Sequence, residues 1–319
     1  MNIEHRTLNV QIGRSMLDVR CSTFNLFTIS AKPSFKCNSV KIRREKEGSN
    51  MGKANALVLN GYGLNCDNET AYAFELAGAN AVRVHINSLI DGTASLEKFQ
   101  ILVFIGGFSW GDDHGAGVIQ SVRLKTNIGD QILEFVAKGN LVMGICNGFQ
   151  TLANLGLLPG LAHNYQKRSV ALAFNDCGNF RNQWVTLKVD PDSPCIFTRG
   201  IDLAELPVRH GEGKFYTDDA TLAGLLDNHQ VALQYALPDG RVADGGFPHN
   251  PNGSIADVAG ICDPSGRIFG LMPHPEAYNH WTNHPDWTRR QELQRRRGDS
   301  LPSTHPVGIR FFQNAVDFV

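Results

Sequence analysis

Cys146 stands between two glycines at the end of an apolar run, an arrangement suited to a nucleophile. The run Leu141–Ile145 predicts a buried strand, and a helical pattern of apolar residues begins just after the cysteine. Gly144 and Gly148 allow a tight strand-to-helix turn that lifts the side chain clear of the backbone. At a helix N-terminus the dipole also favours the thiolate, which is the nucleophilic form. The alternative is a buried cysteine that packs as a small hydrophobic residue.

A histidine and a glutamate follow a second apolar run, Ile268–Met272, far downstream. His274 can serve as the general base for Cys146, and Glu276 can orient the imidazole and stabilise its charged form. In an extended chain residues two apart point to the same side, and the prolines that flank His274 favour an extended segment. Alone, the tripeptide would suggest a surface turn. A nucleophilic cysteine, however, needs a histidine that is distant in sequence and near in space.

A glycine pair, Gly106–Gly107, ends a third apolar run, Ile101–Ile105. Backbone amides of such a loop can point into a cleft, and together with the amide of Asn147 they would form an oxyanion hole. A glycine-rich loop standing alone would be an ordinary strand end. Three strand ends that carry a nucleophile, a base and oxyanion donors predict acyl transfer through a thioester.

The composition is that of an ordinary globular chain. Its 319 residues are 42% hydrophobic and carry a formal net charge of −1, which is enough chain for one large domain or two small ones. The near-neutral charge gives no indication of nucleic-acid binding, and no apolar run approaches the roughly 18 residues that span a membrane. Seven cysteines without regular spacing or a CxxC pair argue against a disulfide framework and a zinc site. We therefore expect reduced thiols, no metal and a cytoplasmic protein.

Residues 1–52 differ from the rest of the chain. They lack a sustained amphipathic period and contain a charged cluster, Lys41–Glu47, shortly before Met51. Phe24–Ile29 is too short and too polar for the core of a secretory signal. We interpret the segment as a disordered extension or the product of a start assigned too early, with an organelle transit peptide as the alternative. Residues 53–319 are then the functional domain.

From Ala54 onward strands and helices alternate. A helix capped by Asn65 or Asp67 and another over 118–137 are expected between strands. The strands themselves are predicted from apolar runs at 56–59, 81–86, 101–105 and 141–145. This alternation predicts an α/β fold with a mostly parallel sheet and helices on both faces. Ligands of such sheets bind beyond the carboxyl ends of the strands, where the three chemical motifs would meet.

The middle of the chain has a different pattern. Gln183–Val189 and Gln230–Tyr235 alternate apolar and polar residues, as half-buried antiparallel strands do. Val258–Leu271 predicts a hairpin that turns at Asp263–Gly266. The sheet is therefore expected to gain antiparallel strands before the chain reaches His274.

With Cys146, His274 and Glu276 in this arrangement, the sequence resembles the class I glutamine amidotransferases, which have a flavodoxin-like sandwich fold. Five further motifs are similar to the glutaminase of phosphoribosylformylglycinamidine synthase, an enzyme of purine synthesis: Gly106–Asp112, Cys195–Phe197, His210–Phe215, Asn250–Ser254 and Gly270–Glu276. The resemblance covers residues 53–319. Without it, the polar His210–Phe215 motif would suggest a surface turn.

The resemblance implies a reaction at Cys146. The cysteine would attack the side-chain amide of glutamine, release ammonia and leave a glutamyl thioester. His274 would give a proton to the leaving amine and then activate water, while Glu276 holds its tautomer. This is a glutaminase, with the thioester as its covalent intermediate.

The resemblance also implies roles around the nucleophile. The amides of Gly107 and Asn147 would form the oxyanion hole, with Phe108 as an alternative to the first. Phe108 and Gln150 would contact the substrate glutamine.

In the family, ammonia passes through a channel to a synthetase site where ATP is consumed. This chain has no GxxxxGK[ST] phosphate loop. ATP and magnesium are therefore expected on a formylglycinamide ribonucleotide synthetase partner, joined in some assemblies by a small accessory subunit, and this chain is expected to hold no cofactor. Nucleic acid and membranes are not expected partners.

Three segments invite other interpretations. Trp110 stands where the family more often has tyrosine, and Asp113–Gly117 also departs from the family pattern. Arg289–Arg297 indicates a solvated helix face, with docking onto the synthetase as the alternative.

Two rival functions use the same residues. One is a thiol hydrolase or peptidase, which has no need of the Gly106–Asp112 or His210–Phe215 motif. The other is a non-catalytic docking protein, which has no need of an intact cysteine, histidine and glutamate.

Overall fold

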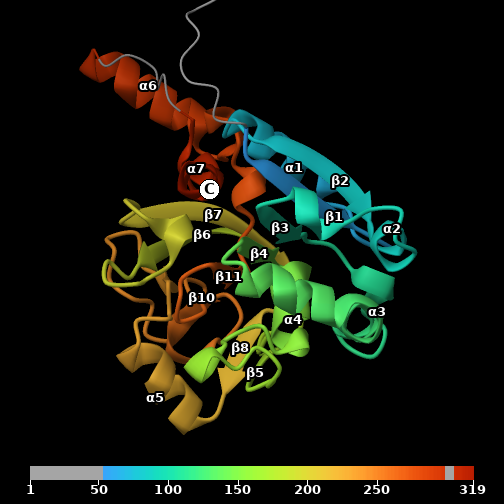
Figure 1. The fold of residues 1–319 in the computed structure, drawn as a ribbon. Coiled ribbons are helices and arrows are strands. Elements are labelled where there is room, and N and C mark those ends of the chain that lie inside the picture. Colours follow the sequence, from blue (N-terminus) through green and yellow to red (C-terminus); the bar gives the residue numbers. More distant parts are fainter. Residues whose placement is uncertain (1–52, 299–304) are drawn as a thin grey trace, which may run out of the picture. The chain divides into compact units, whose positions relative to one another are not determined.

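A nine-stranded mixed sheet is the centre of the fold, with the strand order β2-β1-β3-β4-β11-β10-β9-β6-β7 (Figure 1). The computed structural model describes residues 53–298 and 305–319, so the interpretation of residues 1–52 lies outside the described residues. The strands are β1 (Asn55–Asn60), β2 (Asn80–His85), β3 (Ile101–Phe104), β4 (Leu141–Ile145), β6 (Arg181–Val189), β7 (Leu203–His210), β9 (Leu233–Ala236), β10 (Val258–Cys262) and β11 (Ile268–Leu271).

Five neighbouring strands, β2-β1-β3-β4-β11, run parallel, which confirms the predicted parallel sheet. Every residue of β3 and β4 is buried. Both faces of a parallel sheet are covered by helices, so its strands need apolar residues at every position, and their sequences are continuous apolar runs. β11 pairs in register with β4, so that Gly270 lies opposite Gly144 and Leu271 opposite Ile145. The strand ends that lead to Cys146 and His274 therefore lie side by side.

The other strands add antiparallel pairs, as the alternating patterns predicted. The expected hairpin is confirmed: β10 and β11 are joined by a turn in which a carboxylate oxygen of Asp263 accepts hydrogen bonds from two backbone amides. The predicted strand at Gln230–Tyr235 begins later, at Leu233, as β9. The hairpin delivers the chain to β11 beside β4, which is what positions the histidine.

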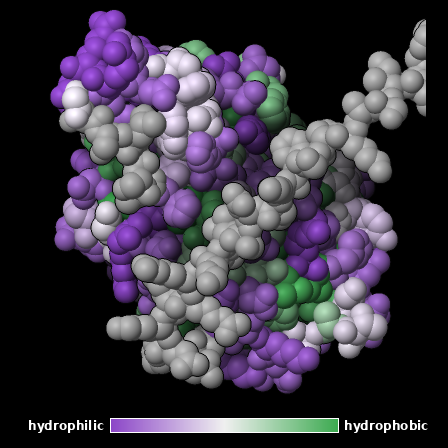
Figure 2. All heavy atoms as spheres, turned by 90° about the horizontal axis from the view of Figure 1, so that it is seen from above, coloured by the Kyte–Doolittle hydropathy of each residue, from purple (hydrophilic) through white to green (hydrophobic). Residues whose placement is uncertain are grey.

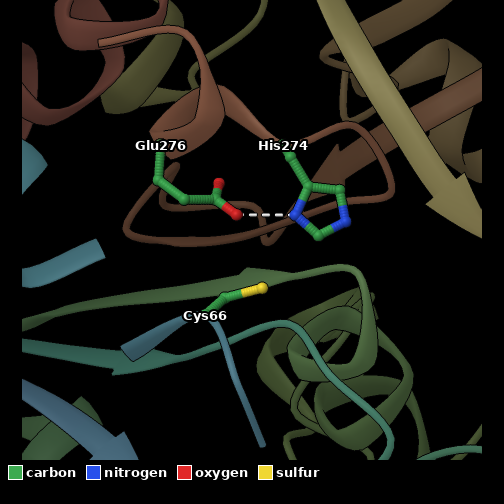
Figure 3. A group of neighbouring side chains, drawn as sticks. All are labelled: Cys66, His274 and Glu276. Carbon is green, nitrogen blue, oxygen red and sulfur yellow. Dashed lines mark hydrogen bonds and ion pairs between the residues drawn. The ribbon is translucent and has the colours of Figure 1, made fainter. Parts of the chain in front are cut away.

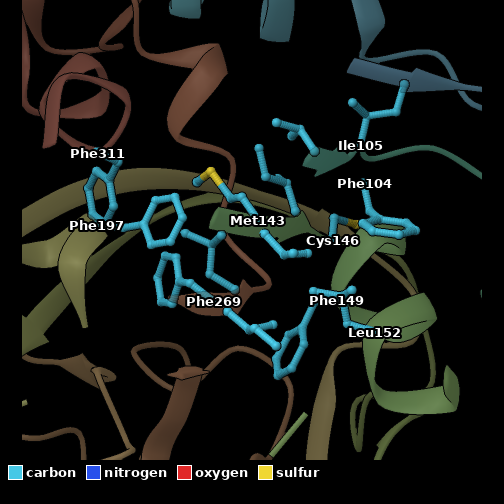
Figure 4. Packing of buried hydrophobic residues seen from close by; sticks show 14 of the residues in the cluster. Phe104, Ile105, Met143, Cys146, Phe149, Leu152, Phe197, Phe269 and Phe311 are labelled. Carbon is cyan, nitrogen blue, oxygen red and sulfur yellow. The ribbon is translucent and has the colours of Figure 1, made fainter. Parts of the chain in front are cut away.

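Helices cover both faces of the parallel strands, as predicted: α1 (Asp67–Leu76), α2 (Ile86–Ile90), α3 (Val118–Ala137), α4 (Asn147–Leu155) and α7 (Val307–Phe318). Successive residues of a strand point to opposite faces. On β11, Phe269 stacks with Phe311 of α7, whereas a Cβ on Gly270 would meet Phe149 of α4 (Figure 4). α7 and α4 therefore lie on opposite sides of β11. α3 packs beside α4, and α7 packs beside α1.

One predicted cap is wrong. The residue that precedes α1 is Cys66, and no side chain in the described part of the chain caps this helix. Asp67 instead lies in the first turn, where its carboxylate pairs with Arg83 at 3.0 Å. Asn65 contacts the thiol of Cys66.

Smaller elements that the sequence did not predict lie beside the large sheet. β5 (Val170–Ala173) and β8 (Lys214–Thr217) form a two-stranded sheet, followed by α5 (Asp219–Asp227). The arginine-rich helix α6 (Trp287–Arg297) buries none of its residues, in line with the predicted solvated face. Figure 2 views the side on which α6 lies in Figure 1, and hydrophilic side chains predominate there outside the grey residues. No helix in the described part of the chain is long and apolar enough to cross a membrane.

Candidate active site

Cys146 occupies the turn between β4 and α4, and its own backbone carries the strain of that turn. Its φ and ψ are 51° and −107°, a conformation that costs on the order of 1–3 kcal/mol for a residue other than glycine. Gly144 and Gly148 do not have a positive φ; glycine is needed at both positions because a side chain there would collide with neighbouring atoms. A Cβ on Gly148 would lie 1.9 Å from the carbonyl oxygen of Phe104, and one on Gly144 would lie 2.6 Å from Leu152.

His274 and Glu276 form a buried pair beyond the end of β11. Nδ1 of His274 lies 2.6 Å from Oε1 of Glu276, and the two residues are 2% and 0% exposed. The backbone amide of His274 donates to the carbonyl oxygen of Pro207 on β7 at 2.8 Å. The predicted extended conformation is wrong beyond His274, because Pro275–Ala277 form a 3₁₀ turn. The two side chains nevertheless meet.

The imidazole of His274 is surrounded by groups that favour its charged form. Burial opposes the charge, but the Glu276 carboxylate and the Cys146 sulfur outweigh it and raise the pKa of His274 well above its ordinary value. Among the described residues, the buried Nε2 has no hydrogen-bond partner, and the Cys146 thiol points to the carbonyl oxygen of Arg209 at 3.7 Å. The imidazole is thus charged and held on one side only, so its second nitrogen is available for proton transfer.

A second cysteine, Cys66, lies beside the same histidine (Figure 3). A Cβ on Gly106 would lie 3.1 Å from the Cys66 sulfur and 2.8 Å from Cε1 of His274. Burial raises the pKa of Cys66, and the neighbouring imidazole of His274 offsets part of that rise. The sequence indicated nothing about this neighbour, because Cys66 belongs to a loop whose course depends on tertiary contacts.

Two clusters in the described part of the chain have the residue types of metal ligands. In one, ligand atoms of Cys66, His274 and Glu276 lie within 4.8 Å of one another. The histidine and glutamate already bond to each other there, so a catalytic pair explains the geometry without a metal. The other is a more exposed surface group, Asp190, Asp192 and His229.

Gly107 and Asn147 present the amides expected of an oxyanion hole. Gly107 has a φ of +142°, and a Cβ there would lie 2.7 Å from the Cα of Leu64, so glycine alone fits. Within residues 53–298 and 305–319, neither amide has a hydrogen-bond acceptor. The amide of Phe108, the alternative donor, bonds to the carbonyl oxygen of Gly63 at 2.9 Å. The free pair is therefore Gly107 and Asn147.

Comparison with known proteins agrees with this geometry. The profile of the CobB/CobQ-like glutamine amidotransferase domain matches residues 53–319. The chain belongs to this family of glutamine amidotransferases. A phosphoribosylformylglycinamidine synthase subunit PurQ of Methanococcus maripaludis is 44% identical over 262 residues, which are 82% of this chain and 96% of that subunit. The PurQ subunit of Dehalococcoides mccartyi is 42% identical over 266 residues, 83% of this chain and 98% of its own. The structure of PurLQS from Thermotoga maritima has a TM-score of 0.61 at 27% identity, covering 84% of this chain and 99% of that one.

In this amidotransferase, the two residues predicted to contact glutamine differ in their surroundings. Gln150 is buried at 4% exposure; its Oε1 accepts from Asn147 at 3.0 Å and its Nε2 donates to the carbonyl oxygen of Glu212 at 2.5 Å. Phe108 is exposed and lies near Phe180. Gln150 is therefore fixed in place by Asn147 and Glu212, whereas Phe108 exposes an apolar ring.

Proposed function

We propose that this chain is the glutaminase subunit of phosphoribosylformylglycinamidine synthase and supplies ammonia to a synthetase subunit in purine biosynthesis. The observation that carries the proposal is the strained Cys146 turn beside the buried His274–Glu276 pair, in a chain that spans 96% of a PurQ relative at 44% identity. Glutamine is the nitrogen donor, and the acceptor is formylglycinamide ribonucleotide.

The first half-reaction forms the thioester. The Cys146 sulfur attacks the carboxamide carbon of glutamine, and the amides of Gly107 and Asn147 hold the oxyanion that develops. In acyl-transfer enzymes, removing one such donor by mutation costs about 2.7–4 kcal/mol of transition-state stabilisation. The C–N bond then breaks as the imidazolium of His274 gives its proton to the leaving nitrogen, and ammonia departs.

The second half-reaction releases glutamate. His274, now neutral, takes a proton from a water molecule that attacks the thioester carbon. The same two amides hold the second oxyanion, and its collapse returns the sulfur as thiolate beside a charged imidazole. Glu276 keeps Nδ1 protonated throughout, which leaves Nε2 for both transfers.

The synthetase partner completes the enzyme. A PurLQS assembly is a structural relative, and we assign to this chain a PurL-type synthetase partner, with a small accessory subunit in some assemblies. We assign ATP and magnesium to that partner, since the sequence contains no phosphate-binding loop. We also place the protein in the cytoplasm, which agrees with its free cysteines in the described residues.

Synthesis by the complex with glutamine and with ammonium salts tests the proposal. Cys146→Ala should abolish glutamine-dependent amidine formation and leave ammonia-dependent formation intact, because ammonia bypasses the thioester. Cys177→Ala, at a half-buried cysteine outside the triad, is the matched control and should keep both activities. Loss of both activities in Cys146→Ala would show that the cysteine is structural. Peptidase turnover by the chain alone, without stimulation by the synthetase, would favour the rival hydrolase.

A further inference from the structure

Two acidic residues of the glutaminase-like motifs have no part in the catalytic steps. Asp112 ends the Gly106–Asp112 motif, and Glu212 lies inside the His210–Phe215 motif. An oxygen of Asp112 accepts from the side-chain amide of Asn147 at 2.9 Å, and an oxygen of Glu212 accepts from the backbone amide of Ala116 at 3.2 Å. Each carboxylate is thereby held in place, and the two are close enough for the charge of Glu212 to act on Asp112.

These carboxylates border the nucleophile. Asn147 follows Cys146 directly, and its side-chain nitrogen bridges Asp112 and Gln150. Gln150 in turn donates to the carbonyl oxygen of Glu212. The Cys146 thiol lies against the carbonyl oxygen of Arg209, in the same strand end that leads to Glu212. Because Asn147 and Gln150 link the cysteine turn to both carboxylates, we expect the α-carbon end of a glutamine joined to the sulfur to lie on their side.

The two carboxylates lack a cation. In residues 53–298 and 305–319, no lysine, arginine or histidine forms an ion pair with Asp112 or Glu212. Their mutual repulsion is evident, since burial and the charge of Glu212 raise the pKa of Asp112 to about 6. The ionised form of Asp112 is therefore held at a cost in stability, which an arriving cation would offset.

The same place also lacks hydrogen-bond donors. Asn147 has no exposed surface, and among the described residues its Oδ1 has no donor. Asp112 and Glu212 each keep a second carboxylate oxygen that accepts no hydrogen bond from the described residues. An alkylammonium group carries one positive charge and three N–H donors, so it matches both the charge and the hydrogen-bonding deficit.

We propose that Asp112 and Glu212 bind the α-ammonium group of glutamine and so select a free amino acid over N-acylated, peptide-bound or des-amino amides. This inference rests on the proposed function, since glutamine is its ligand. A site built to pair with a substrate group rejects analogues that lack it, because its own polar groups are then left unpaired. Glutamine residues inside a peptide carry no free α-ammonium group, so this pair of carboxylates would select against them.

The test compares two reagents for Cys146 in the complex with the synthetase. One is a chloroketone analogue of L-glutamine, and the other is the same chloroketone without its α-amino group. Mass spectrometry of the Cys146 peptide follows the rate of alkylation. The variants are Asp112→Asn and Glu212→Gln, whose amide oxygens still accept the hydrogen bonds from Asn147 and Ala116. Asp113→Asn, at the exposed neighbour, is the matched control.

Each charge-removing variant should slow the amino-bearing reagent about tenfold to a hundredfold, the effect of one charge-assisted hydrogen bond. The des-amino reagent should react at an unchanged rate, which a merely structural defect would not allow. Glu212→Asp, which keeps the charge, should recover part of the rate. If both variants react with the amino-bearing reagent as fast as the wild type does, Asp112 and Glu212 do not bind the α-ammonium group. The proposed glutaminase function is then unaffected. If that reagent does not label Cys146 in the wild type at all, the proposed function itself fails.

Discussion

Nδ1 of His274 lies 2.6 Å from Oε1 of Glu276, and neither side chain exposes more than 3% of its surface. A carboxylate buried this deeply is costly even when it is paired. Among the described residues, its second oxygen, Oε2, has no hydrogen-bond partner, so stability alone does not account for the residue. The pair instead holds a charged imidazole in one orientation beside Cys146.

Glu276→Gln should lower the glutaminase kcat of the complex about a hundredfold or more with little change in KM. The amide cannot hold the imidazolium as the carboxylate does and allows the wrong tautomer. It should also lower the pKa of His274, because the carboxylate is one of the groups that raise it. Steady-state kinetics and NMR of the imidazole nitrogens measure the two effects. Glu75→Gln, on an exposed residue of α1, is the control; a kcat unchanged in Glu276→Gln would remove Glu276 from the triad.

Gly148→Ala and Gly129→Ala should change stability in opposite directions. The new Cβ at Gly148 would lie 1.9 Å from the backbone oxygen of Phe104, which cannot rotate away. We expect a loss of about 1–3 kcal/mol in the free energy of unfolding. At Gly129, within α3, the nearest atom would be 3.9 Å away, so alanine should add about 0.4–1 kcal/mol. Urea unfolding measures the free energy of unfolding of both variants. Equal changes would mean that the turn at Cys146 accommodates a Cβ at position 148 without strain.

The parallel half of the sheet could be predicted from sequence because each of its strands is marked by its own run of apolar residues. Leu141–Ile145 is a continuous apolar run and becomes a fully buried strand. β7 could not, since Pro207 lies within its alternation of apolar and polar residues and argues against a strand. Proline is tolerated there because β7 lies at the end of the strand order, with β6 as its only strand neighbour in the described part of the sheet. Edge strands of this kind are specified by their pairing partner more than by their own residues.

The candidate site divides in the same way. Cys146 and His274 follow strand runs, and the carboxyl ends of parallel strands meet at one edge, so their proximity could be inferred. Cys66 and Glu212 belong to loops, and Asp112 ends a short 3₁₀ turn. Their positions follow from contacts such as that of Ala116 with Glu212, which join segments 96 residues apart. No periodicity in the sequence encodes such a contact.

Asp112→Asn should stabilise the chain near neutral pH. The folded state raises the pKa of Asp112 to about 6, so it binds the proton more tightly than the unfolded chain does. Stability is therefore lost as pH rises from about 4 to about 6, and the loss is complete above that range. The full shift would correspond to roughly 3 kcal/mol, which solvent screening of this half-buried group reduces to about 1 kcal/mol. Thermal unfolding should show the gain at about pH 8 and none at about pH 4, with Asp113→Asn unchanged. An equal gain at both pH values would assign the effect to packing.

Cys66 should remain unmodified in the folded chain while Cys146 reacts with iodoacetamide. The two thiols share His274 as a neighbour, but burial raises the pKa of Cys66 and keeps it as the unreactive thiol at neutral pH. Cys66 should react in the native state only when the pH rises well above its ordinary pKa, and at the same rate as Cys146 once the chain is unfolded in urea. Timed alkylation with mass mapping of both peptides measures this. In Cys146→Ala the label should disappear from the site; its transfer to Cys66 would show that His274 activates either thiol.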